Sequence, residues 1–111
     1  MARASAANTF GLLAAEFIAR MKAGKAEEAA ISKTTWLLED LAKPLAARPI
    51  ADIIPAEVLA VLQKVEKSGR RESARRLRGV IGAVFRHAVI AQRATADPTQ
   101  VLKGAGASGW N

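Results

Sequence analysis

Hydrophobic residues recur at intervals of three and four positions in four stretches of this chain. This spacing places them on one face of an α-helix. Glycine or proline residues separate the stretches and are expected to end the helices. The pattern therefore predicts an all-α protein with four helices around one core. The residues expected to face inward are, helix by helix, Phe10, Leu13, Ala14, Phe17 and Met21; Ile31, Leu37, Leu38, Leu41 and Ala42; Val58, Leu59, Leu62 and Val65; and Leu77, Ile81, Val84, Phe85 and Ala88.

Local signals place the first two helices along the chain. Thr9 can cap the first helix, because its hydroxyl can accept a hydrogen bond from a free amide of the first turn. Glu16 and Arg20 stand four residues apart, and we expect them to pair on the solvent side of this helix. The second helix is predicted to begin within residues 29–32 and to end near Lys43.

A proline-containing connection precedes the third helix. Its hydrophobic residues Leu45, Ile50 and Ile53 are expected to lie beneath the bundle. Pro55 suits the first turn of the third helix, because it has no amide hydrogen to leave unpaired. Gly69 is a natural end for this helix.

The fourth stretch, residues 69–93, carries a line of arginines on the side opposite its hydrophobic face. At 100° per residue these arginines fall within roughly 100° of one another. Gly79 and Gly82 lie on the same side, although glycine costs a helix interior about 1 kcal/mol relative to alanine. We therefore expect something to approach this helix closely, with the phosphate backbone of a nucleic acid as the leading candidate. The arginines are Arg71, Arg75, Arg78, Arg86 and Arg93.

The net charge of +7 is unevenly distributed along the 111 residues. Residues 1–63 contain seven basic and seven acidic side chains, whereas residues 64–111 contain ten basic and three acidic ones. Within the fourth stretch Glu72 is the only acidic residue. A localised basic surface favours a polyanionic partner, and nucleic acid more than a membrane surface.

Composition argues against most kinds of enzyme. The chain has no cysteine and no tyrosine, so it can form neither a thiolate metal site nor a tyrosine nucleophile. His87 is the only histidine, and a lone histidine on the flank of a helix is most often structural or solvated. No paired carboxylates, catalytic triad or glycine-rich phosphate loop is apparent. We therefore expect no catalytic residue, cofactor, metal ion or small-molecule substrate in this chain.

Length and hydropathy indicate one soluble domain. A chain of 111 residues is in the range of a single domain. Its longest apolar runs are far shorter than the roughly 20 residues of a membrane-spanning helix, and the N-terminus lacks the apolar segment of a signal peptide. The expectation is a cytoplasmic protein with no membrane partner.

Trp36 is predicted to lie on the polar side of the second helix, which is unusual for a large apolar ring. There it can contact a phosphate or a partner surface, or it can cover a neighbouring helix end or lysine stem. Besides a DNA-binding domain, two hypotheses remain open. One is a helical transcription regulator that binds DNA, although no compact helix-turn-helix spacing is apparent. The other is a protein-interaction helical bundle whose Trp36 face binds a partner helix.

Four sequence blocks follow one another in the order TFGLLAAEFIARMKAGK, SKTTWLLEDL, ARPIADIIPAEVLAVLQKVEKSG and ESARRLRGVIGAVFRHAVIAQRATADPTQVLKGA. They resemble the core-binding domain of prophage-type tyrosine recombinases, the phage integrase family. The most specific part is RPIADI-x-PAEVL followed by ARRLR, VFRHAV and DP. The resemblance extends from Thr9 to Ala105, and it departs from the family pattern at Ile54, where a threonine is usual.

The resemblance implies an all-α, SAM-like orthogonal bundle of four to five helices that clamps the double-stranded DNA of a recombination site. It implies a core-binding domain (9–103) and a flexible tail (104–111) leading toward a catalytic domain that the chain lacks. Residues 1–8 are small and polar, and we expect them to be disordered or cloning-derived. The parent protein would be a tyrosine recombinase that carries out DNA integration and self-associates on DNA. The residues that the resemblance assigns to DNA binding are Ser32, Lys33, Thr34 and Thr35 of the second helix, and Arg71, Ser73, Arg75, Arg76 and Arg78 of the last helix.

Overall fold

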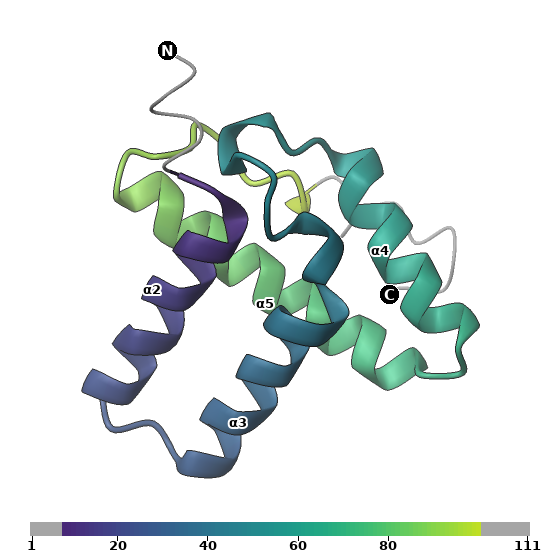
Figure 1. Cartoon of the computed structure of the whole chain (residues 1–111), viewed down its shortest axis with the longest axis horizontal. Coiled ribbons are helices and arrows are strands. Elements are labelled where there is room, and N and C mark those ends of the chain that lie inside the picture. The colour runs from purple at the N-terminus through teal and green to yellow at the C-terminus, as the bar shows by residue number, and fades with distance from the viewer. Residues whose placement is uncertain (1–7, 101–111) are drawn as a thin grey trace.

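The computed structural model describes residues 8–100, which fold into an all-α bundle (Figure 1). The fold class predicted from the hydrophobic spacing is therefore confirmed. Helix α5 crosses behind the upper ends of α2 and α3 in Figure 1 and packs against α2, α4 and a π-helical turn, so the core lies along it. The elements are α2 (Phe10–Ala23), α3 (Glu28–Trp36), the π-helical turn (Leu37–Leu41), 3-10 turns at Lys43–Leu45 and Ile50–Asp52, α4 (Pro55–Lys67) and α5 (Arg71–Ile90).

Helix α2 begins where Thr9 predicts it. The amide of Leu12 donates to the Thr9 hydroxyl at 3.2 Å, which satisfies one of the free amides of the first turn. The buried face differs slightly from the expected one, because Ile18 is buried while Phe17 and Met21 are only half-buried. The spacing of threes and fours did not distinguish between these neighbouring positions.

The second helix is not the regular α-helix that the pattern predicts. Helix α3 begins at Glu28, before the expected range, and continues into the π-helical turn, where the amide of Ala42 donates to the carbonyl of Leu37 at 3.0 Å. A π-helical turn contains one extra residue, so the residue one full turn after Leu37 along the chain is Ala42 and not Leu41. Ala42 is accordingly fully buried, and Leu41 is half-buried.

The connection between the π-helical turn and α4 covers the start of α2. Its residues Leu45, Ile50 and Ile53 are buried, as predicted. The amide of Gly11 donates to the carbonyl of Ala46 at 2.9 Å, and a Cβ atom on Gly11 would lie 3.0 Å from that oxygen. A larger residue would crowd the Ala46 carbonyl, so glycine suits the point where the two segments meet.

Helix α4 is capped from within its own first turn. Ile54, which precedes Pro55, has no side chain that can cap, but the Glu57 carboxylate accepts a hydrogen bond from the Ile54 amide at 3.0 Å. Arg48 holds this carboxylate in place, with its Nε atom 2.7 Å from Glu57 Oε2. The hydrogen bond from Arg48, followed by the one from the Ile54 amide, lowers the pKa of Glu57.

A turn of three residues, Ser68–Arg70, joins α4 to α5. Gly69 in this turn has a φ of 89°, a left-handed conformation that glycine adopts readily, and it ends α4 as predicted. Helix α4 also buries Val61, which the predicted face omitted, and leaves Leu59 half-buried.

Helix α5 supplies the largest share of the core. All five of its predicted inward-facing residues are buried, and the ring of Phe85 lies 6.0 Å from the ring of Phe10 in α2. The helix ends at Ile90, three residues before the predicted end, and Gln92 then adopts a φ of 63°. The chain folds back from there and buries Thr99.

Candidate nucleic-acid interface

A groove between α3 and α5 brings together the two elements that the resemblance assigns to DNA. This α3–α5 groove has a volume of about 640 Å³. Lys33 and Thr34 of α3 line one side, and Arg76 and Gly79 of α5 line the other. Lys33 and Arg76 are both exposed, and Glu72 also lines the groove, so two cations and one carboxylate border one concave surface. The net charge of these three side chains is positive, so the groove favours a polyanion.

The four predicted residues of α3 do not face the same way. Lys33 is exposed in the α3–α5 groove, whereas Thr34 is buried, with 9% of its surface exposed. Ser32 and Thr35 line a different hollow together with Lys22 of α2. The Thr35 hydroxyl also donates a hydrogen bond to the backbone carbonyl of Ile31 at 2.8 Å. Of this group, Lys33 is the residue that the fold presents to the groove.

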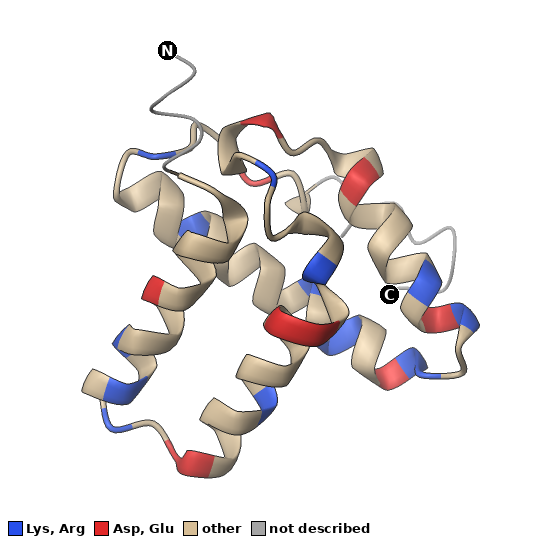
Figure 2. Cartoon of the chain, in the orientation of Figure 1, with Lys and Arg blue, Asp and Glu red and all other residues tan. Residues whose placement is uncertain are grey.

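The segment 70–78 at the start of α5 contains five arginines and one carboxylate, and Figure 2 shows this basic end beside the end of α4. The arginine line is nevertheless not free of counter-charges, contrary to expectation. Arg75 Nη1 and Arg76 Nε lie 3.9 Å and 3.2 Å from the Glu72 carboxylate. Arg71 Nε lies 3.5 Å from the carboxylate of Glu66, the last acidic residue of α4. All three side chains are at least half exposed, so these pairs are weak and leave a positive excess.

Arg78 differs from the other arginines of the line. It is half-buried, and its Nε atom is enclosed with no hydrogen-bond partner among residues 8–100. A buried N–H group without a partner costs free energy. Ser73 is also half-buried. The stem of Arg78 is thus packed against the protein, which the helical spacing alone did not show.

Arg86 and Arg93 are engaged with acidic residues of the same chain. Arg86 Nη1 lies 3.9 Å from the nearly buried carboxylate of Asp97. Arg93 donates a short hydrogen bond to Glu16 of α2. These contacts place both arginines outside the α3–α5 groove. The basic line of the sequence therefore divides into a first half with weak, exposed pairs on and beside α5 and a second half bound to acidic residues of other segments.

Glu16 joins α2 to the end of α5 instead of pairing with Arg20 on the solvent side. Its carboxylate accepts from Arg93 and lies 3.2 Å from His87 Nε2. The hydrogen bond from Arg93, followed by the one from His87, lowers the pKa of Glu16. Arg20 Nη1 donates to the other ring nitrogen of His87 at 3.1 Å. His87 is therefore a structural residue, one of the two roles expected for it.

The two glycines of α5 have different environments. A Cβ atom on Gly82 would lie 2.9 Å from Thr99 Oγ1 and 3.5 Å from Asp97 Oδ2. The close approach expected at Gly82 is therefore made by the protein's own returning chain, and the assignment to a phosphate backbone is wrong there. A Cβ atom on Gly79 would meet no other element of the described chain within 4 Å, and this glycine lies open in the α3–α5 groove.

Trp36 packs between two cations at the edge of the core. The Lys33 amine lies 5.1 Å from the ring centroid, and the Arg70 guanidinium lies 5.7 Å from it. The ring is partly buried against the core. These contacts agree with the interpretation in which Trp36 lies beside a lysine and a helix end.

Residues 8–100 contain neither a metal-binding cluster nor a membrane-spanning helix. In that range no three His, Asp or Glu side chains come together in a way that could hold a metal ion. None of the helices described there has the length and apolar character needed to cross a membrane.

The bundle and its sequence define a small all-α domain of the integrase type. Residues 10–105 match the family described as the phage integrase central domain, and the chain belongs to this family. It is similar to prophage integrase IntZ of Escherichia coli (strain K12), with 37% identity over 93 residues. The alignment covers 84% of this chain and 23% of that relative, so the chain spans less than a quarter of the relative's length. No solved structure matches the chain at a significant level.

Proposed function

We propose that this chain is the non-catalytic DNA-binding domain of a phage or prophage integrase and that it clamps the duplex of a recombination site. The observation that carries the proposal is the α3–α5 groove, in which Lys33 and Arg76 flank one concave surface. Family membership supports it, since the matched domain belongs to integrases. The same membership favours an integrase over a transcription regulator, and the packed position of Trp36 gives no support to a Trp36-centred protein contact.

In this proposal the duplex backbone lies along the start of α5 and reaches α3. Lys33 and Arg76 contact phosphates inside the groove, while Arg71 and Arg75 contact phosphates at its outer edge. Guanidinium groups form paired hydrogen bonds with phosphate oxygens, which fixes the position of the domain on the duplex. Gly79 adds no side chain to the groove and lets the DNA backbone approach the helix.

The cutting and joining of DNA are assigned to a part of the parent integrase outside this chain. The chain contains no tyrosine and spans 23% of the similar integrase. Its own contribution is to hold the recombination site in register for that other part. The parent protein would self-associate on the DNA, as the sequence resemblance implies.

Titration of the chain against an attachment-site duplex at about 50 mM and about 200 mM salt tests the proposal. Binding is expected to be micromolar or weaker at the higher salt and much tighter at the lower salt, because each phosphate contact releases condensed counterions. Fluorescence anisotropy of a labelled duplex measures both affinities. An affinity that does not change with salt concentration, or an absence of binding at low salt, would contradict the proposal.

Charge-removing variants locate the surface. Arg75→Gln and Arg76→Gln are each expected to weaken binding and to lower the slope of log affinity against log salt by about 1, the effect of one lost phosphate contact. Lys22→Gln is the matched control, because Lys22 is an exposed cation of α2 outside the α3–α5 groove. Equal losses of duplex affinity in all three variants would show a nonspecific effect of net charge.

A further inference from the structure

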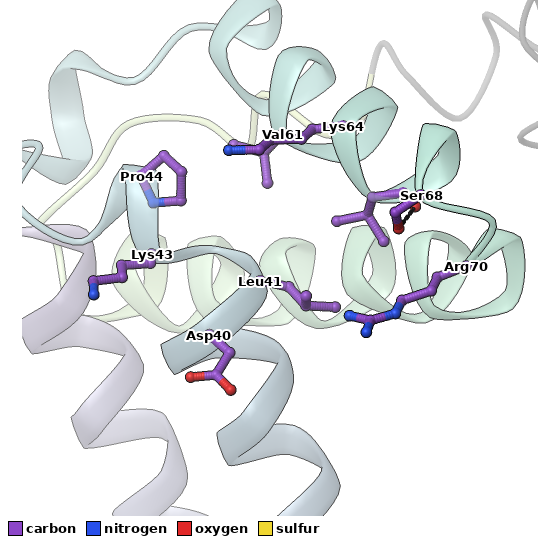
Figure 3. Close-up of a pocket in the computed structure, with 9 residues that line it drawn as sticks. Asp40, Leu41, Lys43, Pro44, Val61, Lys64, Ser68 and Arg70 are labelled. Atoms are coloured by element: carbon purple, nitrogen blue, oxygen red, sulfur yellow. Dashed lines mark hydrogen bonds between the residues drawn. The ribbon is translucent and has the colours of Figure 1, made fainter.

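A second groove lies between the π-helical turn and α4, and its walls are apolar (Figure 3). Its volume is about 400 Å³, enough for a large side chain and part of a peptide. Leu41 lines one wall, Val61 and Val65 of α4 line the opposite wall, and Pro44 closes one end. None of the residues that line it also lines the α3–α5 groove.

The rim of this second groove is cationic. Lys43, Lys64 and Arg70 stand around the apolar walls, and Asp40 is the one acidic residue among those that line the groove. All three basic residues are exposed, and in the described part of the chain none of them is within 4.0 Å of a carboxylate. The Arg70 guanidinium is held over the Trp36 ring, 5.7 Å from its centroid, so one cation of the rim is fixed in place.

We propose that this groove is a docking site for an acidic peptide segment of a partner protein. The segment inserts a large apolar side chain between Leu41 and Val61, and its carboxylates meet Lys43, Lys64 and Arg70. The charge of the rim selects an acidic ligand, and the apolar walls select a side chain that removes them from water. This interaction is separate from the proposed DNA binding.

The chemistry of the walls distinguishes this occupant from the alternatives. A DNA backbone satisfies the charged rim but brings no aliphatic or aromatic side chain to fill the groove. The chain's own residues 101–111 contain one lysine and no aspartate or glutamate, so they do not complement the rim. A protein segment with both carboxylates and an apolar residue satisfies both parts of the groove.

The test uses the whole chain and a fluorescein-labelled synthetic peptide of sequence EDLFEELD, with fluorescence anisotropy as the readout. A second peptide, EDGGEEGD, has the same charges without the apolar side chains. We expect the second peptide to bind at least about tenfold more weakly than the first. Lys64→Glu is expected to weaken binding of EDLFEELD by about tenfold or more, because it reverses one charge of the rim.

Lys67→Glu is the matched control, because Lys67 is an exposed lysine of the same helix that does not line the groove. This variant is expected to bind EDLFEELD within about twofold of the unchanged chain. Circular dichroism establishes that both variants keep the helical fold. Equal loss of peptide binding in both variants would overturn the proposal.

Other outcomes that would overturn the proposal identify the alternative occupant. Equal binding of the two peptides would mean that only surface charge is recognised. If Lys64→Glu weakened duplex binding as much as Arg75→Gln does, the groove would belong to the DNA surface. If the chain failed to bind EDLFEELD, and sedimentation equilibrium showed a dimer that Lys64→Glu dissociates, the occupant would be a second copy of this chain.

Discussion

Gly79 and Gly82 stand three residues apart on α5, and their neighbours give them opposite roles. Both cost the helix conformational free energy relative to alanine. At Gly82 this cost accompanies tight packing, because Thr99 lies where a side chain would be and Asp97 holds the Thr99 hydroxyl at 2.6 Å. At Gly79 no other element of the described chain occupies the equivalent space. A glycine in a helix therefore has to be interpreted from what surrounds it.

Alanine substitutions at the two glycines should separate these roles. Gly79→Ala is expected to raise the free energy of unfolding by about 1 kcal/mol, because it improves helix propensity without a clash. Gly82→Ala is expected to give no such gain and to lower the stability, because its Cβ atom would lie 2.9 Å from Thr99 Oγ1. Urea unfolding followed by circular dichroism measures both changes, and equal stabilisation by the two substitutions would contradict this packing.

Helix α4 shows how an element replaces a missing local signal. The sequence lacks a capping side chain at Ile54, and the structure supplies the carboxylate of Glu57, held by Arg48. The arginine line that begins in α5 shows a different effect, since it divides into a half with weak, exposed ion pairs and a half bound by Asp97 and Glu16. In both elements the partner of a charged group comes from another part of the fold.

The cap of α4 should make the stability depend on pH in the acid range. Because Arg48 and the Ile54 amide lower the pKa of Glu57 below 4.5, its ionised form stabilises the fold at neutral pH. That stabilisation is lost as the pH falls through the lowered pKa. Glu57→Gln is therefore expected to be less stable than the unchanged chain near about pH 7, with the difference shrinking near about pH 3.

Urea unfolding at the two pH values measures this difference. Glu39→Gln is the control, because Glu39 is an exposed carboxylate with no ion pair among the described residues. It is expected to change the stability little at either pH. A difference for Glu57→Gln that stays constant with pH would show that its charge does not stabilise the cap.

At the scale of the whole molecule, the protein is organised around α5. Its buried face joins α2, α4 and the π-helical turn into one core, and its two ends carry the charged contacts. The α3–α5 groove and the second groove open between different pairs of elements, so one small bundle presents two surfaces of different chemistry.

The core contact between α5 and α2 should contribute strongly to the stability. Phe85 is 1% exposed and its ring lies 6.0 Å from the ring of Phe10. Phe85→Ala is expected to lower the free energy of unfolding by about 3–5 kcal/mol, a large part of the total for a small domain. Leu12→Ala is the control, since Leu12 is 42% exposed, and it should change stability by less than about 0.5 kcal/mol. Chemical denaturation compares the two, and similar losses would contradict the core described for α5.

The sequence by itself determined the helical class, the core face of α5, the cap at Thr9 and the end of α4 at Gly69. These features depend on spacing along one helix or on the conformation of one residue, so they are local and can be recognised in the chain. The family could also be recognised, because its blocks follow one another in a characteristic order.

Only the tertiary structure decided which acidic residues pair with the arginines, what approaches Gly82, how Trp36 is packed and where Ser32 and Thr35 lie relative to the α3–α5 groove. It also decided the π-helical turn, at the end of which Ala42 is buried as predicted while Leu41 is only half-buried. Each of these depends on residues that are distant in the sequence, such as Glu16 with Arg93 and Gly82 with Thr99. Helical periodicity specifies the direction of a side chain around its own axis, whereas its contacts depend on how the helices cross.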